Sequence, residues 1–319
     1  MGESKDYDVV IVGGGAAGLS GALALARARR SVLVVDAGRP RNAPAAHAHN
    51  YLGLDGVAPQ DLLAAGRADV TGYGGEIVSG RVVSARRRQD GRFDVLSEDG
   101  TVYGARRLLI TTGLVDELPQ LPGMAELWGR DVLHCPYCHG WEVRDQAIGI
   151  LAGSPMAVHQ ALLWSQWSKD VTLFLHTAAE PSEEQYEELA ARGVSVVDGE
   201  VEALEIEDGR LAGVRLAGGK VIARQALAVA PRFTAVTDVL ATLGLKSEDT
   251  EVNGAVIGSS VPSDPTGATT VPGVWVAGNV TDIMAQLITS AADGLRAGAT
   301  INFDLINEEV RRAVEVRAA

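Results

Sequence analysis

The sequence predicts an α/β protein made of two nucleotide-binding units that follow one another along 319 residues. Two observations predict this fold class. The chain opens with a buried strand, a glycine-rich turn and an Ala/Leu-rich helix, which is the order of a dinucleotide-binding unit. The order of strand, helix, strand, meander and strand then occurs again after Gly113, which indicates an internal repeat. A hydrophobic content of 46% with 37 glycines suits such a globular chain.

The first unit begins with the apolar, β-branched residues 8–12, which are typical of a buried parallel strand. Gly13-x-Gly15-x-x-Gly18 follows, and a helix is predicted from about residue 16 to residue 29. The glycines permit a tight turn and bring the backbone close to a pyrophosphate at the helix N-terminus. A second strand over residues 31–35 ends at Asp36, where an acid accepts ribose hydroxyls and favours FAD or NAD over NADP.

The segment after the second strand contains polar residues and then a meander. Arg41-Asn42 and the stretch His47-Ala48-His49-Asn50 are interpreted as a polar surface loop. Between residues 76 and 113, short alternating strands are separated by Asp90-Gly91 and Asp99-Gly100, a pattern that predicts antiparallel hairpins. The last of these strands leads into Thr111-Thr112-Gly113.

The second unit repeats the order of the first. A strand is predicted over residues 147–151, and a helix over residues 156–167 with Ser154-Pro155 as its N-cap and first residue. A strand over residues 171–175 follows the helix. The next meander turns at Asp208-Gly209 and Gly218-Gly219 and ends in a strand over residues 227–230.

The nucleotide site of the second unit departs from the fingerprint. Residues 152–157 read Ala-Gly-Ser-Pro-Met-Ala, so one of the three glycines remains. The strand after the helix leads into His176-Thr177-Ala178-Ala179, without an acid for a ribose or an arginine for a 2′-phosphate. The simpler interpretation is that this unit keeps its fold and has lost its ligand. Weak nucleotide binding is the alternative.

The C-terminal part returns to apolar strands. Residues 274–279 form a predicted strand with a glycine-rich end, and residues 285–291 open a helix whose N–H groups can face an electron-rich ring. Residues 305–319 alternate charged and apolar side chains in a helical pattern and are interpreted as a solvated C-terminal helix.

Cys135 and Cys138 are the only cysteines in the chain. Two thiols separated by two residues close and open a small disulfide ring, and one of them often has a lowered pKa and reacts as the thiolate. Half of a zinc site would need two further ligands, and no second cysteine pair supplies them. Haem attachment fits Cys135-x-x-Cys138-His139 literally but takes place outside the cytosol. The spacing therefore favours a redox-active dithiol, and it is hard to reconcile with two buried cysteines of no consequence.

Charge and hydropathy restrict the partners. The net charge of −13 argues against nucleic acid or an anionic membrane surface as a partner. No apolar run reaches membrane-spanning length, and the polar residues 1–8 lead directly into a strand, so we expect neither a transmembrane segment nor a secretory signal. We therefore expect a cytoplasmic protein with a catalytic rather than structural cysteine pair and without a metal site.

Four motifs in this order resemble the low-molecular-weight thioredoxin reductase family: the Gly13 to Gly18 turn, Thr111-Thr112-Gly113, the mid-chain CxxC and Ala277-Gly278-Asn279. The resemblance covers essentially the whole chain and implies a homodimer. It implies two Rossmann-like, three-layer nucleotide-binding domains. The domains implied are a discontinuous FAD domain of residues 1–115 and 247–319, and a central, degenerate NADPH-like domain of residues 116–246 that carries the CxxC.

The resemblance also implies roles for individual residues. Cys138 would face the flavin ring, and Cys135 would exchange with substrate. The ADP part of FAD would lie against Gly13, Gly15, Gly18 and Asp36. The other residues implied to bind FAD are Ala17, Arg41, Asn42, Asn50, Val82, Thr112, Gly113, Gly278, Asn279, Gln286 and Leu287.

Four departures from the thioredoxin reductase pattern indicate a specialised branch. His139 and Asn279 each stand where the family usually has Asp. Residues 152–157 replace a Gly-x-Gly-x-x-Ala turn, and His176 is all that remains of a His-Arg-Arg element for NADPH. The combination of Cys-x-x-Cys-His-Gly-Trp with this eroded site is similar to the thioredoxin-reductase-like dithiol oxidases of gliotoxin, holomycin and romidepsin biosynthesis. Residues 135–146 are most similar to the bacterial, holomycin-type members.

This second resemblance implies oxidation of a small-molecule dithiol to an intramolecular disulfide, in the biosynthesis of a disulfide natural product or in self-protection from it. Electrons would pass from Cys135 and Cys138 to FAD and then to O2, giving H2O2, with no role for NADPH. His139 is the first candidate for the general acid and base and His134 the second, because an unperturbed histidine titrates at about pH 6.5. Two alternatives stay open: an NADPH-dependent reductase of thioredoxin or a small disulfide, and a flavin-bound redox sensor without turnover.

Overall fold

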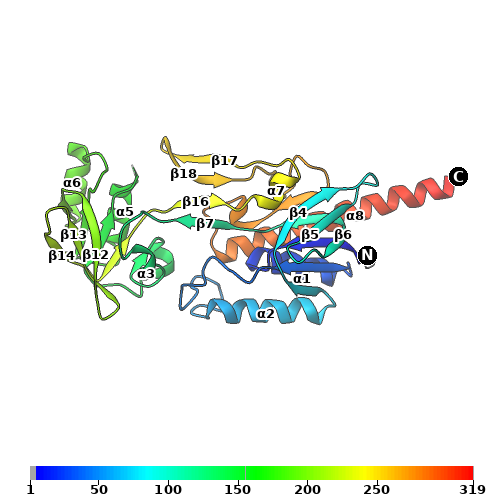
Figure 1. Ribbon diagram of the computed structural model, residues 1–319, viewed down its shortest axis with the longest axis horizontal. Coiled ribbons are helices and arrows are strands. Elements are labelled where there is room, and N and C mark those ends of the chain that lie inside the picture. Colours follow the sequence, from blue (N-terminus) through cyan, green and yellow to red (C-terminus); the bar gives the residue numbers. More distant parts are fainter. Residues whose placement is uncertain (1–4, 155, 319) are drawn as a thin grey trace.

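The structure is a computed structural model that describes residues 5–154 and 156–318. The chain forms two bodies, each with its own sheet, and two strands cross between them (Figure 1). The first body contains the N-terminal part of the chain and the C-terminal helix, and the middle of the chain forms the second body (Figure 1).

The first body is built on a seven-stranded sheet. Its strands are β1 (Asp6–Val12), β2 (Val32–Asp36), β3 (Glu76–Ser79), β4 (Val82–Arg87), β5 (Phe93–Ser97), β6 (Val102–Ile110) and β19 (Val274–Val276). They are ordered β3-β2-β1-β6-β5-β4, and β19 also pairs with β6. The pairs among β3, β2, β1, β6 and β19 are parallel, whereas β4, β5 and β6 form the predicted antiparallel meander.

Helices cover both faces of this sheet. Val9 and Ile11 point to the face covered by α1 (Ala16–Arg27), α2 (Pro59–Gly72) and α8 (Leu287–Ala318). Val10 and Val12 point to the other face, where α7 (Asp238–Thr242) packs, because side chains alternate along a strand. Helices α1 and α8 approach closely at Gly294, where a Cβ would lie 1.9 Å from the carbonyl oxygen of Ala17. The first body is therefore a three-layer unit.

The second body repeats this arrangement. Its parallel strands are β8 (Val132–Leu133), β9 (Ile148–Leu151), β10 (Val171–Phe174), β11 (Ser195–Val197) and β15 (Ala226–Ala228), and its meander strands are β12 (Val201–Glu207), β13 (Arg210–Leu216) and β14 (Val221–Ala223). The order β11-β10-β9-β15-β8 matches β3-β2-β1-β6-β19 of the first sheet, so the internal repeat and the α/β fold class are confirmed.

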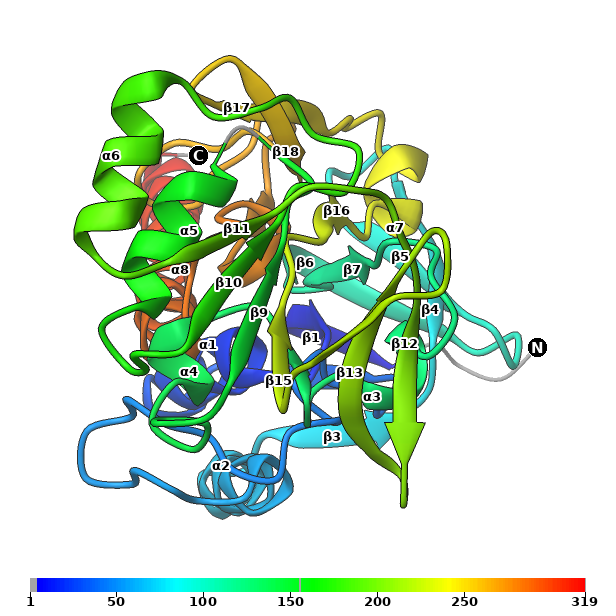
Figure 2. The same cartoon turned by 90° about the vertical axis from the view of Figure 1, so that its left-hand side faces the viewer.

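The faces of the second sheet are covered differently from each other. Helices α5 (Ala157–Trp164) and α6 (Glu183–Ala191) lie on one side, and the meander lies on the other side with α3 (Met124–Leu127) (Figure 2). Fully buried side chains meet on both faces, among them Trp164 on the helical side and Phe174 on the meander side. The second body thus has its own core.

The strands that join the bodies are β7 (Leu114–Glu117) and β16 (Arg232–Ala235), which pair antiparallel. With β17 (Glu248–Val252) and β18 (Ala255–Ser260) they form a four-stranded sheet. After β16 the chain packs on the first body again, because Val239, Leu240 and Leu245 enter its core. The sequence-based boundary at residue 246 is therefore later than the point at which the chain returns to the first body.

Most expected strands and helices are confirmed, and the differences have local reasons. Helices α2 and α6 are missing from the sequence-based expectation, although Pro59 begins α2 and a capping box of Ser182 and Gln185 begins α6. The expected solvated C-terminal helix is confirmed for residues 305–318, most of which are exposed from residue 310 onward, and it is the end of α8, one helix of 32 residues. Pro155, the expected first residue of the helix, lies outside the described residues, and α5 begins at Ala157.

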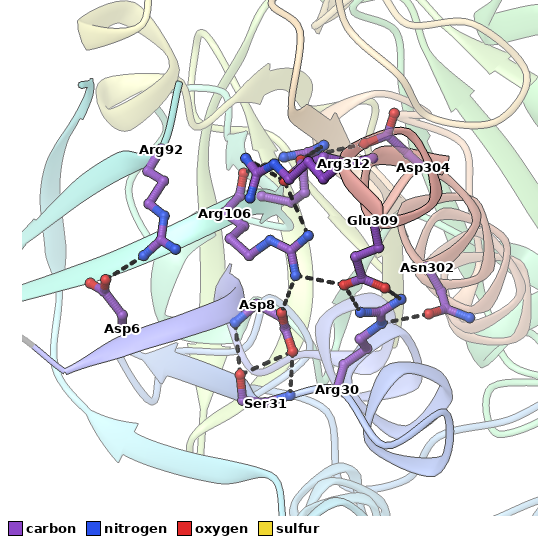
Figure 3. A network of polar contacts seen from close by, with 12 residues as sticks. Asp6, Asp8, Arg30, Ser31, Arg92, Arg106, Asn302, Asp304, Glu309 and Arg312 are labelled. Atoms are coloured by element: carbon purple, nitrogen blue, oxygen red, sulfur yellow. Dashed lines mark hydrogen bonds and ion pairs between the residues drawn. The ribbon is translucent and has the colours of Figure 1, made fainter. Parts of the chain in front are cut away.

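An ion-pair network connects α8 to the sheet of the first body. Arg106 of β6 donates hydrogen bonds to Asp8 and Glu309, both at 2.8 Å (Figure 3). Arg30 donates to Glu309 and to Asn302, so β1, β6, α8 and the segment after α1 are joined (Figure 3). The network fixes the direction of the outer part of α8, which extends beyond the rest of the first body (Figure 1).

Glu309 gives this network a pH dependence. Hydrogen bonds from Arg30, and then from Arg106, lower the pKa of Glu309 from its ordinary value of 4.5 to about 2. The carboxylate therefore stays ionised in the folded protein at pH values where it is protonated in the unfolded chain. Its contribution to stability is complete above pH 4.5 and is lost as the pH falls towards about 2.

We expect Glu309→Gln to lower the melting temperature at pH 7 by about 2–4 °C, or about 1 kcal/mol for a partly exposed ion pair. The difference from the wild type should shrink by more than half at about pH 3, because the unfolded wild-type chain is then protonated at Glu309 and folding must remove that proton to form the ion pair. Circular dichroism during heating measures the difference, and Glu315→Gln on the exposed end of α8 is the control. A difference that is the same at pH 7 and pH 3 would contradict the assignment.

Candidate active site

The glycine turn between β1 and α1 has the shape of a phosphate-binding turn. The N–H of Gly13, whose φ is 105°, donates to Val35 O at 2.9 Å. A Cβ on Gly18 would lie 1.9 Å from Gly13 O, so a larger residue does not fit there. A Cβ on Gly15 would meet nothing within 4 Å, which leaves the N-terminus of α1 open to a ligand. The first N–H groups of this helix can therefore bind a pyrophosphate.

Asp36 ends β2 beside an open cavity of ≈ 380 Å³ that Arg67 also lines. The N–H groups of Gly14 and Gly38 donate to Asp36 Oδ1, both at 3.2 Å. Arg67 Nη2 donates to Asp36 Oδ2 at 2.7 Å. A carboxylate offers about four lone-pair positions, so Oδ2 keeps one for a ribose hydroxyl. The glycine turn and Asp36 together fit the ADP part of FAD, and Arg67 is a contributor that the sequence did not reveal.

The polar residues after β6 and β19 hold the main chain around this turn. Thr111 Oγ1 donates to Gly13 O at 2.9 Å, and Thr112 Oγ1 donates to Val236 O at 2.7 Å. Gly278 lies against α1, since a Cβ on it would be 2.9 Å from Ala17 Cβ. The ends of β6 and β19 are therefore gathered beside the glycine turn.

The remaining residues expected at FAD have several different surroundings. Arg41 forms a two-point ion pair with Asp116 and donates to Asn279 Oδ1 at 3.3 Å. Asn279 Nδ2 donates to Ala285 O at 2.9 Å and closes the turn that leads to Gln286 and Leu287 at the start of α8. The side chain of Val82 is buried in the core, and the backbone oxygen of Asn42 accepts from Ala45 N. Contact of each of these residues with FAD stays a prediction.

Cys135 and Cys138 form a disulfide at the start of the second body. Their Cα atoms are 5.2 Å apart, and Cys135 is the N-cap of the short helix α4 (Pro136–His139). The N–H of Cys138 donates to Cys135 Sγ at 3.2 Å. A hydrogen bond to the charged form of a group favours that form, so this N–H would stabilise a Cys135 thiolate in the reduced pair.

His134 and His139 flank the disulfide in the sequence and are both largely buried. His134 Nδ1 lies 3.0 Å from Val229 O, which only accepts, so Nδ1 carries the proton and Nε2 is left as an acceptor. Burial lowers the pKa of His134, and the hydrogen bond to Val229 O partly opposes this. Burial also lowers the pKa of His139, and the negative charge of Glu142 opposes it. Both imidazoles are therefore neutral near pH 7.

A loop of the first body contacts the disulfide segment. Asn50 Nδ2 donates to Tyr137 O, inside the CxxC, at 2.6 Å. His49 Nε2 lies 3.4 Å from Glu142 Oε1, and 20% of the His49 side chain is exposed. Residues 47–50 are a polar loop with His47 and Asn50 exposed, as expected, and this loop also contacts the CxxC segment. The sequence gives no sign of this contact, because the two segments are far apart along the chain.

The altered turn of the second body is contacted by the first body. Asn253, in the turn between β17 and β18, donates from Nδ2 to Met156 Sδ at 3.1 Å. Gly153 of the same turn is exposed, and a Cβ on it would meet nothing within 4 Å. His176 Nδ1 accepts the N–H of Val201 at 3.0 Å, so this histidine serves the fold of the second body.

Two further features are absent from the described part of the chain. Within it, no group of three or more His, Cys, Asp or Glu side chains is placed to hold a metal ion. Among the helices of residues 5–154 and 156–318, none combines the length and the apolar character required to cross a bilayer.

Comparisons with known proteins agree with this geometry. The family model for pyridine nucleotide-disulphide oxidoreductases matches residues 7–294. The chain is 32% identical over 320 residues to thioredoxin reductase tcpT of Claviceps purpurea, with 96% of each chain covered. It is 31% identical over 324 residues to thioredoxin reductase sirT of Leptosphaeria maculans, covering 95% of this chain and 96% of sirT. The crystal structure of HlmI superposes with a TM-score of 0.91 and 44% identity, covering 100% of this chain and 99% of HlmI.

The fold and the site define a flavin-dependent oxidoreductase that carries a disulfide beside its cofactor-binding body. The chain belongs to the pyridine nucleotide-disulphide oxidoreductase family, and within it to the thioredoxin reductase-like group that the sequence resembles. Thioredoxin reductases of this family are FAD enzymes, in agreement with the fit of the first body to FAD.

We expect Gly15→Ala to weaken FAD binding by about tenfold or more, because the added methyl group would keep the pyrophosphate away from the backbone N–H groups, and losing one hydrogen bond to a charged group costs about 1.5–3 kcal/mol. The melting temperature of the FAD-free protein should not change, since a Cβ at this position meets no protein atom within 4 Å. The ratio of flavin to protein absorbance after dialysis measures retention. Gly72→Ala, which also meets nothing within 4 Å, is the control. Full flavin retention in Gly15→Ala would contradict the assigned cofactor position.

Proposed function

We propose that the protein oxidises a small-molecule dithiol to an intramolecular disulfide and transfers the two electrons to O2, which leaves as H2O2. The balance is one dithiol and one O2 consumed for one disulfide and one H2O2 formed. We further propose a cytoplasmic location and a role in making, or protecting the cell from, a disulfide natural product. The similarity to HlmI, tcpT and sirT supports this class of reaction.

The observation that carries the proposal is the state of the second nucleotide site. Residues 152–157 keep one glycine, and Asn253 of the first body contacts Met156 in this turn. His176, the one residue that matches the expected NADPH element, accepts the main-chain N–H of Val201. An enzyme without a site for NADPH must take its electrons from the thiol substrate. These contacts therefore favour electron flow from the dithiol towards oxygen.

The cysteine pair carries the exchange of disulfides. A substrate thiolate attacks Cys135 Sγ, the protein disulfide breaks, and Cys138 leaves as the thiolate. The second substrate thiol, once deprotonated, attacks the substrate sulfur of the mixed disulfide and releases Cys135. The substrate is then a cyclic disulfide, and the cysteine pair holds the two electrons. Bound FAD supplies the two-electron acceptor that restores the protein disulfide and that oxygen reoxidises.

His139 and His134 supply the proton acceptors for these steps. Each substrate thiol must lose a proton before it attacks, and the lowered pKa values of both histidines leave neutral rings ready to accept it. His139 is the first candidate because it follows Cys138 directly. His134 is the second, and its free acceptor is Nε2.

An exposed aromatic surface beside the disulfide suits a small organic substrate. Tyr137 lies between the two cysteines and is 57% exposed, and Trp141 is 65% exposed. Trp141 also stacks with the guanidinium of Arg144, whose carbon lies 4.2 Å from the ring centroid.

An NADPH-dependent disulfide reductase is the second candidate, since it would use the same cysteine pair and the same FAD-binding body.

With dithiothreitol as the dithiol and without NADPH, we expect the flavin-loaded protein to consume O2 and form H2O2 in a ratio of one to one. Cys135→Ser and Cys138→Ser should each lower the rate by about 100-fold or more, because the covalent route is lost. An oxygen electrode measures the O2 consumed, and a peroxidase-coupled assay measures the H2O2 formed. Stoichiometric bleaching of the flavin by NADPH under anaerobic conditions would instead support the reductase.

We also propose that the protein is a homodimer formed through the outer part of α8. Five exposed apolar side chains of this helix share one face, since their spacing follows the helical period. They are Leu295, Phe303, Ile306, Val310 and Val314. A continuous apolar patch of this kind marks an interface in soluble proteins, and the homodimer implied by the family resemblance offers the partner.

We expect Phe303→Glu combined with Val310→Glu to convert the dimer to a monomer, because a buried, unpaired carboxylate opposes association. Sedimentation velocity at micromolar concentration measures the mass. Val221→Glu, at an exposed valine of β14 in the second body, should leave the dimer intact. A wild-type protein that sediments as a monomer would rule out the proposed interface.

A further inference from the structure

The loop of residues 48–57 is ordered by its own hydrogen bonds before it meets the second body. The N–H of Ala48 donates to Val57 O at 2.8 Å, and the N–H of Gly56 donates to Ala48 O at 2.9 Å. The N–H of Asn50 donates to Asp55 Oδ1 at 2.8 Å, and Asn50 adopts a left-handed conformation with φ of 61°. The loop is therefore a fixed support for the side chains that it presents.

His49 lies on this support between two carboxylates. Its Nδ1 is 3.3 Å from Asp55 Oδ2, and its Nε2 is 3.4 Å from Glu142 Oε1. The Asp55 side chain is 67% exposed, whereas the ring of His49 is mostly buried. Glu142 follows the CxxC, and its N–H donates to His139 O at 3.2 Å. The carboxylate of Glu142, the ring of His49 and the carboxylate of Asp55 thus lie in a row beside the disulfide segment, with Asp55 the most exposed of the three.

The inner nitrogen of His49 is poorly satisfied. Nε2 is buried, and no atom of the described residues forms a hydrogen bond with it. Buried polar atoms are nearly always hydrogen-bonded, so such an atom calls for an explanation. The carboxylate of Glu142 is within ion-pair distance but not in hydrogen-bonding geometry. A small rotation of Glu142 would bring the two atoms into a hydrogen bond, through which a proton can pass.

Both Glu142 and His49 affect the pKa of His139. Besides burial, the groups that act on His139 are Glu142, which raises its pKa, and His49 and His134, which lower it. His134 is itself faced by Arg41 and Asp116. The ring of His47 lies 6.3 Å from that of His49.

We propose that His49 is a positioning residue for the thiol chemistry, which acts through Glu142 to set the protonation of His139 and to pass protons to Asp55 at the surface. The proposal rests on the dithiol chemistry proposed above, in which each turnover releases two thiol protons next to a half-buried disulfide. An imidazole is suited to this role because one ring nitrogen accepts a proton while the other releases one. Sulfur and electron transfers remain with the cysteine pair.

The test compares His49→Gln, Glu142→Gln and the control His47→Gln, which lies on the same loop and contacts Gly56 O instead of the disulfide segment. Flavin bleaching by dithiothreitol under anaerobic conditions is followed by stopped flow between about pH 5.5 and pH 9. His139 must be neutral to accept a proton, so the rate rises with pH through its pKa.

The two variants should move this rise in opposite directions. Loss of the Glu142 charge lowers the pKa of His139 and moves the rise to lower pH, whereas loss of the His49 ring moves it to higher pH. His49→Gln should also be about tenfold slower at neutral pH, because the ring that passes the proton is lost. Added imidazole should restore its rate, because imidazole in solution can carry the proton instead. His47→Gln should match the wild type.

A loss of rate with an unchanged pH profile and no rescue by imidazole would overturn the proposal, because a purely structural role has that result. If His49→Gln does not fold, the shift in Glu142→Gln decides alone, and an unshifted profile there overturns the proposal. Bleaching requires only the cysteine pair and FAD, so it reports on His49 whether or not oxygen is the final acceptor. Oxygen consumption by the wild type tests the proposed function separately.

Discussion

The contact between the CxxC segment and the first body is the interaction on which the site depends. The disulfide belongs to one body and the dinucleotide turn to the other, so neither can exchange electrons alone. The hydrogen bond from Asn50 Nδ2 to Tyr137 O, at 2.6 Å, joins the bodies inside the CxxC itself. It is made by a loop that Asp55 already holds in shape. The hydrogen bonds within the first body therefore already order this loop, and the contact with Tyr137 O requires little further loss of conformational entropy.

The same arrangement of the two bodies has a second consequence. Arg41 and Asp116 fix the joining strand β7 next to His134, and Asn253 reaches across to Met156 at the altered turn. The placement that brings the disulfide to the first body thus also puts Asn253 against Met156 in the altered turn of the second body. Under the proposed function, this contact and the missing glycines of the turn would both oppose nucleotide binding there.

The parts of the molecule that the sequence predicted are those with short-range signals. The glycine turn, Asp36, the hairpin turns and the CxxC are each defined by neighbouring residues, and the internal repeat follows from their order. Helix α2 was not predicted because only three of its residues, Pro59, Leu63 and Val70, are buried, so its apolar periodicity is weak. The contact of His49 with Glu142 has no local signal, since it exists only when two segments distant in the chain are brought together by the fold.

The proposed direction of electron flow depends on access rather than on the catalytic groups. Neutral histidines beside the disulfide would assist thiol exchange in both directions, because a group that accepts a proton from an attacking thiol returns it to a leaving thiolate. What would differ is which electron donor can reach the pair. Tyr137 and Trp141 are exposed beside the disulfide, whereas the altered turn of the second body keeps one glycine and is contacted by Asn253. A site that admits thiols and binds nucleotides poorly would be reduced by its thiol substrate, and this asymmetry is the physical argument for the oxidase that we propose.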